Sequence, residues 1–314
     1  MSTATTVPET HGQSGDDARD QLRRTGLVRL LVDAGRRFHA ADGTSYARAL
    51  GLSSLLSLIP GLIGVAGLIA AIDVGNAQGR LADALRSLAP GPAGGTLSEA
   101  LRAERAGTVA LLVGLLGMLV SGTLAMVHLE RGANRIYGVE EHRPTRRRFA
   151  IAFATAATAG VLLMLGLLVI ASAGAVGDPS AAGTSDSSSG VWEIFRWPVA
   201  VLLVALPMTV IFRFGPNRRQ PNYSWLLSGT FVAVVLWIAV TMALTLFYEH
   251  AASLGETYGP LLGVVALLVW AYLTAVAVLY GLAVAAQLEA IRAGESDPTR
   301  DAERRSTDQD VVRI

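Results

Sequence analysis

The sequence is dominated by long apolar stretches that contain almost no ionised side chain. A helix needs about 20 such residues to cross the hydrocarbon core of a bilayer, which is about 30 Å thick, because each residue adds about 1.5 Å. Six windows meet this requirement: residues 47–72, 107–129, 149–176, 196–214, 223–248 and 261–290. The sequence therefore predicts an all-α, polytopic transmembrane helical bundle of six spans. Five or seven spans would require the fourth window to be dropped or the last to be split.

Composition excludes an ordinary soluble domain. Only 16% of the 314 residues are charged, whereas soluble domains usually contain about 25%. Cysteine is absent, which removes disulfides, thiolate metal sites and a cysteine nucleophile. We expect neither a metal nor a cofactor.

The arginines predict which side of the membrane each connecting segment faces. Basic connecting segments stay on the cytoplasmic side, and arginine is concentrated before the first window and after the second, fourth and sixth. Segments 177–195 and 249–260 contain none, and the four arginines of 73–106 are balanced by four acidic residues. Both termini are therefore predicted to be cytoplasmic.

A stripe of apolar residues in the segment 21–46 predicts an amphipathic helix in the cytoplasmic interface. The stripe consists of Leu27, Leu30, Leu31, Ala34 and Phe38. Arginines flank it, and we expect them near lipid phosphates: Arg24, Arg29, Arg36 and Arg37.

The rest of the chain divides by composition into tails and a membrane domain. The predicted parts are a disordered cytoplasmic tail at 1–20, a six-span domain at 47–292 with an outer helical hairpin at 73–106, and a charged cytoplasmic tail at 293–314.

Two windows contain a central proline, Pro60 in the first and Pro207 in the fourth. A proline removes one helical hydrogen bond, and nearby serine hydroxyls could satisfy the freed carbonyl. One interpretation is a kinked helix used for packing. The other is a broken helix beside a substrate path, because the first and fourth spans correspond in a three-plus-three inverted repeat. The residues of this hypothetical path are Ser53, Ser57, Pro60, Gly61, Gly64 and Pro207.

Ionisable residues gather at the end of the second window rather than near the middle of any window. Ionisable groups buried in the middle of a span usually mark proton relays. Because no predicted window has one near its middle, the sequence argues against a proton-driven pump. A hydrolytic site could use His128 and Glu130, but no HExxH, GxSxG or Walker motif is present, and we expect no enzyme. The basic loop is interpreted as a topology determinant that contacts anionic lipid head groups: Arg131, Arg135, Arg143, Arg146, Arg147 and Arg148. It lacks the interleaved aromatic residues that nucleic-acid binding requires.

Five motifs occur in a fixed order: LSLIP at 56–60, LERGANRIYGVEEHRP at 129–144, ETYGPLLG at 256–263, LLVWAYL at 267–273 and LYG at 279–281. The ordered set resembles the YihY/BrkB family of bacterial inner-membrane proteins, once labelled ribonuclease BN, over residues 40–292. On that resemblance the following residues take the family's pattern positions: Pro60, Asn134, Tyr137, Gly138, Tyr258, Gly259, Trp270 and Gly281. Members often carry Gly-Ala-Glu in the last span, where this sequence has Gly281, Leu282 and Ala283.

The resemblance implies a multi-pass protein of the bacterial cytoplasmic membrane. Three hypotheses follow: a transporter of lipid or of a small molecule with a path near the first and fourth spans, an envelope scaffold that docks a partner through residues 134–148 or the outer hairpin, and, with least support, a membrane-bound nuclease. The expected partners are the bilayer and anionic head groups. A homo-oligomer is left open, and no nucleic acid is expected.

Overall fold

The long apolar windows form helices wherever the structure describes them. The computed structural model describes residues 4–9, 15–72, 79, 82, 86, 89–103, 108–140, 143–176, 202, 204–250, 260–295 and 297–299. Its labelled helices are α1 (Gly15–Thr25), α2 (Leu27–Ala40), α3 (Gly43–Ile72), α5 (Pro92–Ala103), α6 (Thr108–Tyr137), α7 (Thr145–Val176), α10 (Tyr223–His250) and α12 (Pro260–Arg292). A shorter helix, Val204–Phe214, precedes α10. Within the described residues, the only β-type pairing is an isolated bridge between Ala4 and Thr299. The predicted all-α class is confirmed.

Four helical segments are long and apolar enough to cross a membrane: Gly43–Leu68, Leu111–Tyr137, Tyr223–His250 and Leu261–Arg292. They match the first, second, fifth and sixth predicted windows. The 32-residue α7 occupies the third window, and the helix Val204–Phe214 lies in the fourth, most of whose earlier residues are outside the described part of the chain. A helical bundle with several candidate spans is thus confirmed, whereas the count of six and the cytoplasmic position of both ends stay predictions.

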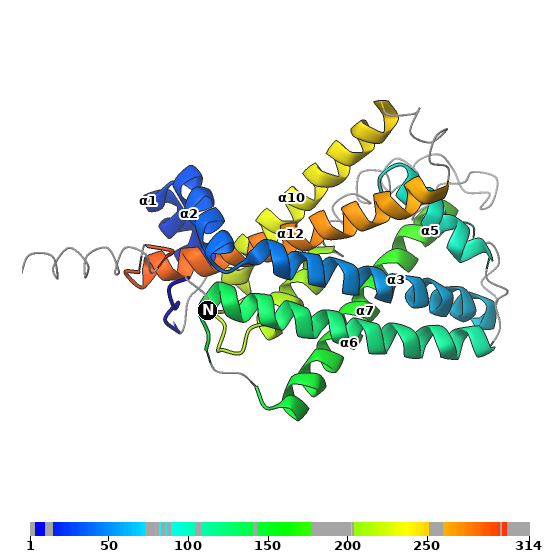
Figure 1. Ribbon diagram of the computed structural model, residues 1–314, viewed down its shortest axis with the longest axis horizontal. Helices are drawn as coiled ribbons and strands as arrows, with labels where there is room; N and C mark the ends of the chain where they lie inside the picture. Colours follow the sequence, from blue (N-terminus) through cyan, green and yellow to red (C-terminus); the bar gives the residue numbers. More distant parts are fainter. Residues whose placement is uncertain are drawn as a thin grey trace, which may run out of the picture.

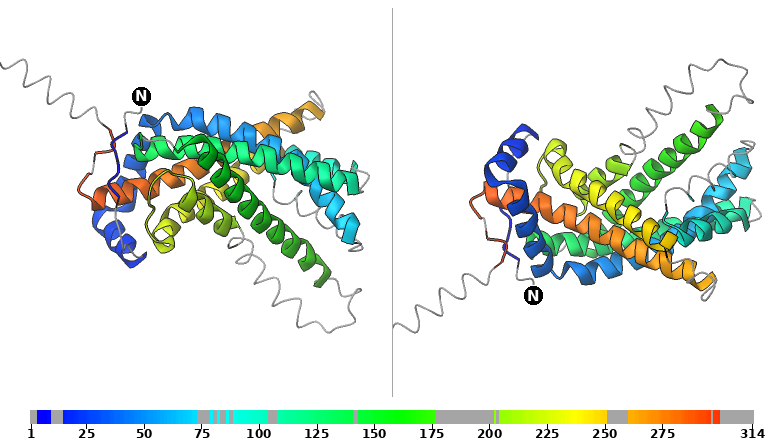
Figure 2. Two further views of the ribbon diagram at one scale, coloured as in Figure 1. Left: turned by 90° about the horizontal axis from the view of Figure 1, so that it is seen from below. Right: turned by 90° about the horizontal axis from the view of Figure 1, so that it is seen from above.

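The helices are arranged around two main packed pairs. α3 runs beside α6, and α12 packs against α10, α3 and α2 (Figure 1). α7 diverges from the α3–α6 pair towards its C-terminal end, as both views in Figure 2 show. α1 and α2 lie at the end of the bundle where α12 finishes. We call this the strap end, after the N-terminal strap (residues 4–9), which lies there.

The described part of the predicted disordered tail differs from that expectation. In the strap, the backbone N–H of Thr5 donates to the carbonyl of Pro298 at 3.2 Å, and that of Val7 donates to the carbonyl of Tyr137 at 3.0 Å. These bonds to fixed backbone groups order a segment whose composition alone gives no reason for order. Residues 15–20 belong to α1.

The single helix expected over 21–46 is divided in the structure. α1 ends at Thr25, and Gly26 follows with a φ of 82°, a left-handed conformation that glycine adopts without steric cost. α2 then ends before Asp42, whose φ is 56°, and α3 begins at Gly43. The described segment therefore turns twice where one continuous helix was expected.

The apolar stripe of α2 packs against protein on one side only. Leu30, Ala34 and Phe38 are buried, whereas Leu27 is 53% exposed. Leu30 and Ala34 share a core with Val284 and Leu288 of α12. Arg37 was expected beside lipid phosphates but is 0% exposed. That expectation is wrong for the described structure, because protein acceptors surround the Arg37 guanidinium.

Glycines allow α3 and α6 to approach at backbone distance. A Cβ atom at Gly114 would lie 2.6 Å from the Cα of Gly64, and one at Gly67 would lie 2.7 Å from the Cα of Leu111. No real side chain fits at these separations. Small residues produce such close approaches between helices in membranes.

Alanine at Gly114 should therefore weaken the α3–α6 pair. We expect Gly114→Ala to lower the free energy of unfolding by about 1–3 kcal/mol, because the new methyl overpacks the interface. Gly122→Ala on the same helix is the control, since its Cβ would meet the Cβ of Ala156 at an ordinary 3.6 Å. Thermal unfolding of both purified variants in one detergent gives the comparison. Equal midpoints would contradict the close approach at Gly114.

Candidate functional site

A buried ion pair lies at the strap end, near the last turn of α12. The Oε1 atom of Glu289 accepts a hydrogen bond from Nη2 of Arg218 at 2.7 Å, and the two side chains are 0% and 2% exposed. Arg218 belongs to the loop 215–222, and its guanidinium lies 4.6 Å from the centroid of the Tyr137 ring. Removing two charges from water costs several kcal/mol per ion, so such groups persist only when they are well paired. This pair ties the loop to α6 and α12.

Arg37 forms a second buried cationic centre beside that pair. Its Nε donates to Oε1 of Gln287 at 2.7 Å, and its Nη1 donates to the carbonyls of Thr5 at 2.8 Å and Ile136 at 3.2 Å. Its Nη2 donates to the hydroxyl of Thr5 at 2.9 Å. Burial lowers the pKa of Arg37 to about 10, so the side chain is still cationic at neutral pH. One guanidinium therefore joins α2, α6, α12 and the N-terminal strap.

The N-terminal strap is held by arginines that bind its backbone. Arg218 donates to the carbonyls of Val7 at 3.3 Å and Pro8 at 3.1 Å. Gly138 has a φ of 66°, and a Cβ there would lie 2.7 Å from the Cα of Thr6. Position 138 therefore requires glycine for two reasons: the left-handed backbone angle, and the contact with the strap, which leaves no room for a side chain.

A third cluster fastens the loop 215–222 to α6. Glu130 is 2% exposed and contacts Nη1 of Arg143 at 3.4 Å and Nε of Arg148 at 3.6 Å. The Oδ1 atom of Asn134 accepts from the backbone N–H of Asn217 at 2.7 Å. Arg143 also donates to Oδ1 of Asn217 and to the carbonyls of Phe214, Gly215 and Pro216. Because these acceptors occupy its N–H donors, the Arg143 guanidinium is held in one position.

The side chains around the Arg143 guanidinium carry more positive than negative charge. Burial lowers the pKa of its guanidinium, Glu130 raises it, and the charges of Arg147 and Arg148 lower it. Three guanidinium groups therefore share the field of one carboxylate.

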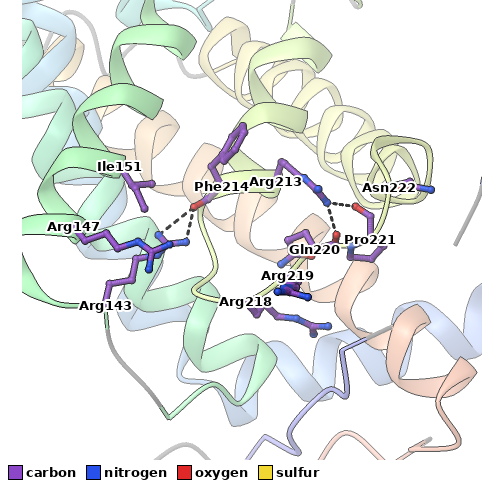
Figure 3. A pocket seen from close by; sticks show the side chains of 10 residues that line it. All are labelled: Arg143, Arg147, Ile151, Arg213, Phe214, Arg218, Arg219, Gln220, Pro221 and Asn222. Carbon is purple, nitrogen blue, oxygen red and sulfur yellow. Dashed lines mark hydrogen bonds between the residues drawn. The ribbon is translucent and has the colours of Figure 1, made fainter. Parts of the chain in front are cut away.

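These clusters border a pocket of about 700 Å³ between the start of α7 and the loop 215–222 (Figure 3). Half of its ten lining residues are arginine: Arg143, Arg147, Arg213, Arg218 and Arg219. The others are Ile151, Phe214, Gln220, Pro221 and Asn222. No carboxylate is among the described lining residues. The pocket therefore has the chemistry of an anion site with one apolar wall.

The structure separates the arginines that sequence analysis grouped as lipid contacts. Arg131, Arg146 and Arg147 are exposed, as that interpretation requires. The side chains of Arg143 and Arg148 are only 10% and 17% exposed, because both turn inward to Glu130. For these two the expectation of a solvated lipid contact differs from what the structure describes.

Most of the residues proposed as a path on α3 lie against α6. A Cβ at Gly61 would meet Met118, one at Gly64 would meet Leu115, and one at Gly117 would meet the ring of Pro60. Pro207 is buried in the helix Val204–Phe214. The described contacts of Gly61 and Gly64 match the packing interpretation of these glycines.

The serines of α3 bond within their own helix rather than to the carbonyl that Pro60 frees. The hydroxyl of Ser53 donates to the carbonyl of Ala49, and that of Ser57 donates to the carbonyl of Ser53, each at 2.8 Å. Ser53 also lies 2.8 Å from Nδ1 of His128. This contact occupies Nδ1 of His128 and joins α3 to α6.

The remaining family-pattern residues have structural contacts where they are described. A Cβ at Gly281 would lie 2.6 Å from the carbonyl of Gly229, so this glycine lets α12 approach α10. The indole N–H of Trp270 donates to the hydroxyl of Thr241 at 3.2 Å. Tyr258 and Gly259 lie outside the described residues.

Sequence reasoning missed the partners of Glu289 and Arg37. Glu289 lies near the end of the last predicted window, where its charge alone does not indicate a partner. Spacing does give a signal for Arg37, because it follows Leu30 by seven residues and so lies on the same face of the helix. Nothing in the sequence signals that residues 4–9 would supply its acceptors.

Comparison with known proteins gives one family and several relatives. A family described as virulence factor BrkB matches residues 34–306. A ribonuclease-like protein, YfkH of Bacillus subtilis, is 25% identical over 80% of this chain and 92% of its own length. UPF0761 membrane proteins of Chromohalobacter salexigens and Rhodospirillum centenum are 29% and 28% identical, over 88% and 90% of this chain. The chain spans only 67% and 63% of the length of these two relatives. No solved structure matches the chain.

Proposed function

Because the chain belongs to the virulence factor BrkB family of membrane proteins, we propose that it moves a lipid or another amphiphilic small molecule across or along the bacterial cytoplasmic membrane. In this proposal the chain crosses the membrane six times, and both termini are cytoplasmic. The pocket at the strap end is where the polar part of the substrate binds.

Contacts between the two ends of the chain support an even number of crossings. Thr5 bonds to Pro298, so residues near the two termini lie on one side. The loop 215–222 meets the strap through Arg218 and meets the end of α6 through Asn134. Every segment that the arginine pattern predicts to be cytoplasmic thus contributes described residues to the same end.

The observation that carries the proposal is an arginine-lined pocket beside exposed aromatic rings. Phe214, which lines the pocket, is 45% exposed, and Tyr223, whose ring centroid lies 5.4 Å from the guanidinium carbon of Arg213, is 51% exposed. Aromatic side chains of this kind are enriched where a membrane protein meets the boundary between head groups and hydrocarbon. A site with cations on one wall and apolar rings at its rim suits a molecule with a charged head and an apolar tail.

The structure also bears on where a path would run. The glycines of α3 are occupied by α6, so we place the path on the other side of α6, between α7 and the helix Val204–Phe214. Pro207 then remains a candidate path residue, while Ser53, Ser57, Pro60, Gly61 and Gly64 shape the helix pair that supports it.

Reconstitution of the purified full chain into liposomes tests the proposal. We expect exchange of fluorescent phospholipid between leaflets to exceed that of empty vesicles and to rise with the protein-to-lipid ratio. Vesicles containing the same protein after heat denaturation control for bilayer damage. Exchange equal to both controls, with a panel of amphiphilic solutes equally inert, would reject the transport proposal.

The alternatives are less well supported by the described contacts. A scaffold that docks through residues 134–148 could use only part of that segment, because Asn134 is 2% exposed and Arg143 bonds inward, whereas Arg146 and Arg147 are exposed. A nuclease built on His128 and Glu130 would need them to act together, yet His128 contacts Ser53 and Glu130 contacts arginines. The word ribonuclease in the name of the Bacillus subtilis relative belongs to that protein.

A further inference from the structure

We propose that the arginine pocket binds the phosphate group of an anionic phospholipid, and that Arg147 and Arg219 are the side chains that grip it. The inference rests on the proposed function only in that it places the strap end at the boundary between membrane and water. It names a ligand class and two ligand-binding residues.

The charge balance of the pocket requires an anion. Three carboxylates contact its arginines: Glu289 pairs with Arg218, Glu130 is shared between Arg143 and Arg148, and Glu9 accepts a hydrogen bond from the backbone N–H of Arg219 at 2.9 Å. Arg213 is directed at the neutral carbonyls of Gln220 and Pro221. The pocket therefore keeps an excess of positive charge in a partly desolvated place, where like charges repel strongly. A bound anion would relieve that repulsion.

The arginines that are available to bind a ligand differ from the arginines that hold the fold together. Arg143, Arg213 and Arg218 are held by backbone and side-chain acceptors, so they set the shape and the field of the pocket. Arg147 and Arg219 are exposed, and no hydrogen bond or ion pair engages their guanidinium groups in the described part of the chain. They stand on different elements of the lining, Arg147 on α7 and Arg219 on the loop 215–222 (Figure 3). A guanidinium binds phosphate oxygens through paired, charge-assisted hydrogen bonds.

The surroundings favour a phosphate carried on a lipid over free phosphate. Ile151 and Phe214 form part of the lining, and the half-exposed ring of Tyr223 lies 5.4 Å from the guanidinium carbon of Arg213. The volume of about 700 Å³ falls in the range of about 300–1,000 Å³ that small-molecule sites occupy. An inorganic ion would leave the apolar wall without a partner, whereas acyl chains would cover it.

Equilibrium binding to the full chain in detergent tests the inference. The probes are a short-chain phosphatidylglycerol, a phosphatidylcholine of the same chain length and inorganic phosphate. The test variant is Arg147→Gln with Arg219→Gln. The control is Arg131→Gln with Arg146→Gln, which removes the same charge from exposed arginines outside the pocket.

We expect the wild type to prefer phosphatidylglycerol, because the choline cation of the other lipid would meet the arginines. Loss of two charged hydrogen-bond donors should weaken phosphatidylglycerol binding by roughly tenfold to a hundredfold, while the control stays within about twofold, since neither Arg131 nor Arg146 lines the pocket. Equal thermal midpoints of the two variants would show that both are folded.

Three results would overturn the inference: equal losses in both variants, no preference between the two lipids, or displacement of the lipid by inorganic phosphate at similar concentrations. The last would assign the site to free phosphate. Binding with the expected preference in a protein that moves no lipid would support the inference and reject the transport proposal. Lipid movement that is unchanged in the test variant, together with unchanged binding, would reject the inference alone.

Discussion

Glu289→Gln is expected to lower the free energy of unfolding by about 3–5 kcal/mol, the usual cost of removing one partner from a buried ion pair. Glu289 and Arg218 are 0% and 2% exposed, so water cannot replace the lost charge. Glutamine keeps the size of the side chain and one acceptor, which isolates the effect of charge. The measurement is the unfolding midpoint of the purified protein in one detergent, together with the yield of monodisperse protein.

Glu249→Gln is the matched control, because Glu249 is exposed at the C-terminal end of α10, away from the strap end. It should leave the midpoint unchanged. A second variant, Glu289→Gln with Arg218→Met, removes both charges and should be no less stable than Glu289→Gln alone, since the uncompensated cation is gone. If Glu289→Gln and Glu249→Gln unfold together, the pair does not stabilise the strap end.

Arg37→Lys is expected to cost about 3 kcal/mol, although it conserves the charge. The Arg37 guanidinium donates to Gln287, Thr5 and Ile136 from fixed directions. A lysine ammonium cannot reach these acceptors together, and buried acceptors left unsatisfied cost about 1–3 kcal/mol each. The N-terminal strap should loosen as well, because two of those four bonds go to Thr5.

The neighbouring residue gives the control, since the side chain of Arg36 is 68% exposed. Arg36→Lys should behave as the wild type. Hydrogen exchange reports the strap directly: the amides of Thr5 and Val7 should exchange faster in Arg37→Lys and at the wild-type rate in Arg36→Lys. Equal protection in both variants would mean that Arg37 does not hold the strap.

Apolar length let the sequence predict most of the long helices. The windows ending at 72, 176 and 248 lie within two residues of the ends of α3, α7 and α10, because a run of apolar residues has few other stable states in a bilayer. The second window ended at 129, eight residues before α6 ends at Tyr137. The polar residues that close it looked like a loop but are helical, since Glu130 pairs with Arg143 and Arg148, and Asn134 accepts a hydrogen bond from Asn217 of the loop 215–222.

The candidate site was largely beyond sequence reasoning. Arg218 and Glu289 are 71 residues apart, and no local pattern joins them. The amphipathic stripe of α2 was predicted, but Arg37 was expected near lipid phosphates with the other arginines that flank the stripe, and charged side chains are rarely buried. Burial of Arg37 depends on Thr5 and Gln287, which only the folded chain brings together. The glycines of α3 were given two interpretations, helix packing and a substrate path, and spacing could not identify the α6 residues that they contact.

The bonds that join Thr5 to Pro298 and Arg37 to Gln287 have a consequence for biosynthesis. During synthesis, Thr5 and Arg37 leave the ribosome long before Pro298 and Gln287. The N-terminal strap therefore cannot reach its final state until α12 has been made and inserted. A nascent chain stopped before α12 presents Arg37 without Gln287 and Thr5 without Pro298. Closure of the strap therefore reports that α12 has been made and has packed against α2.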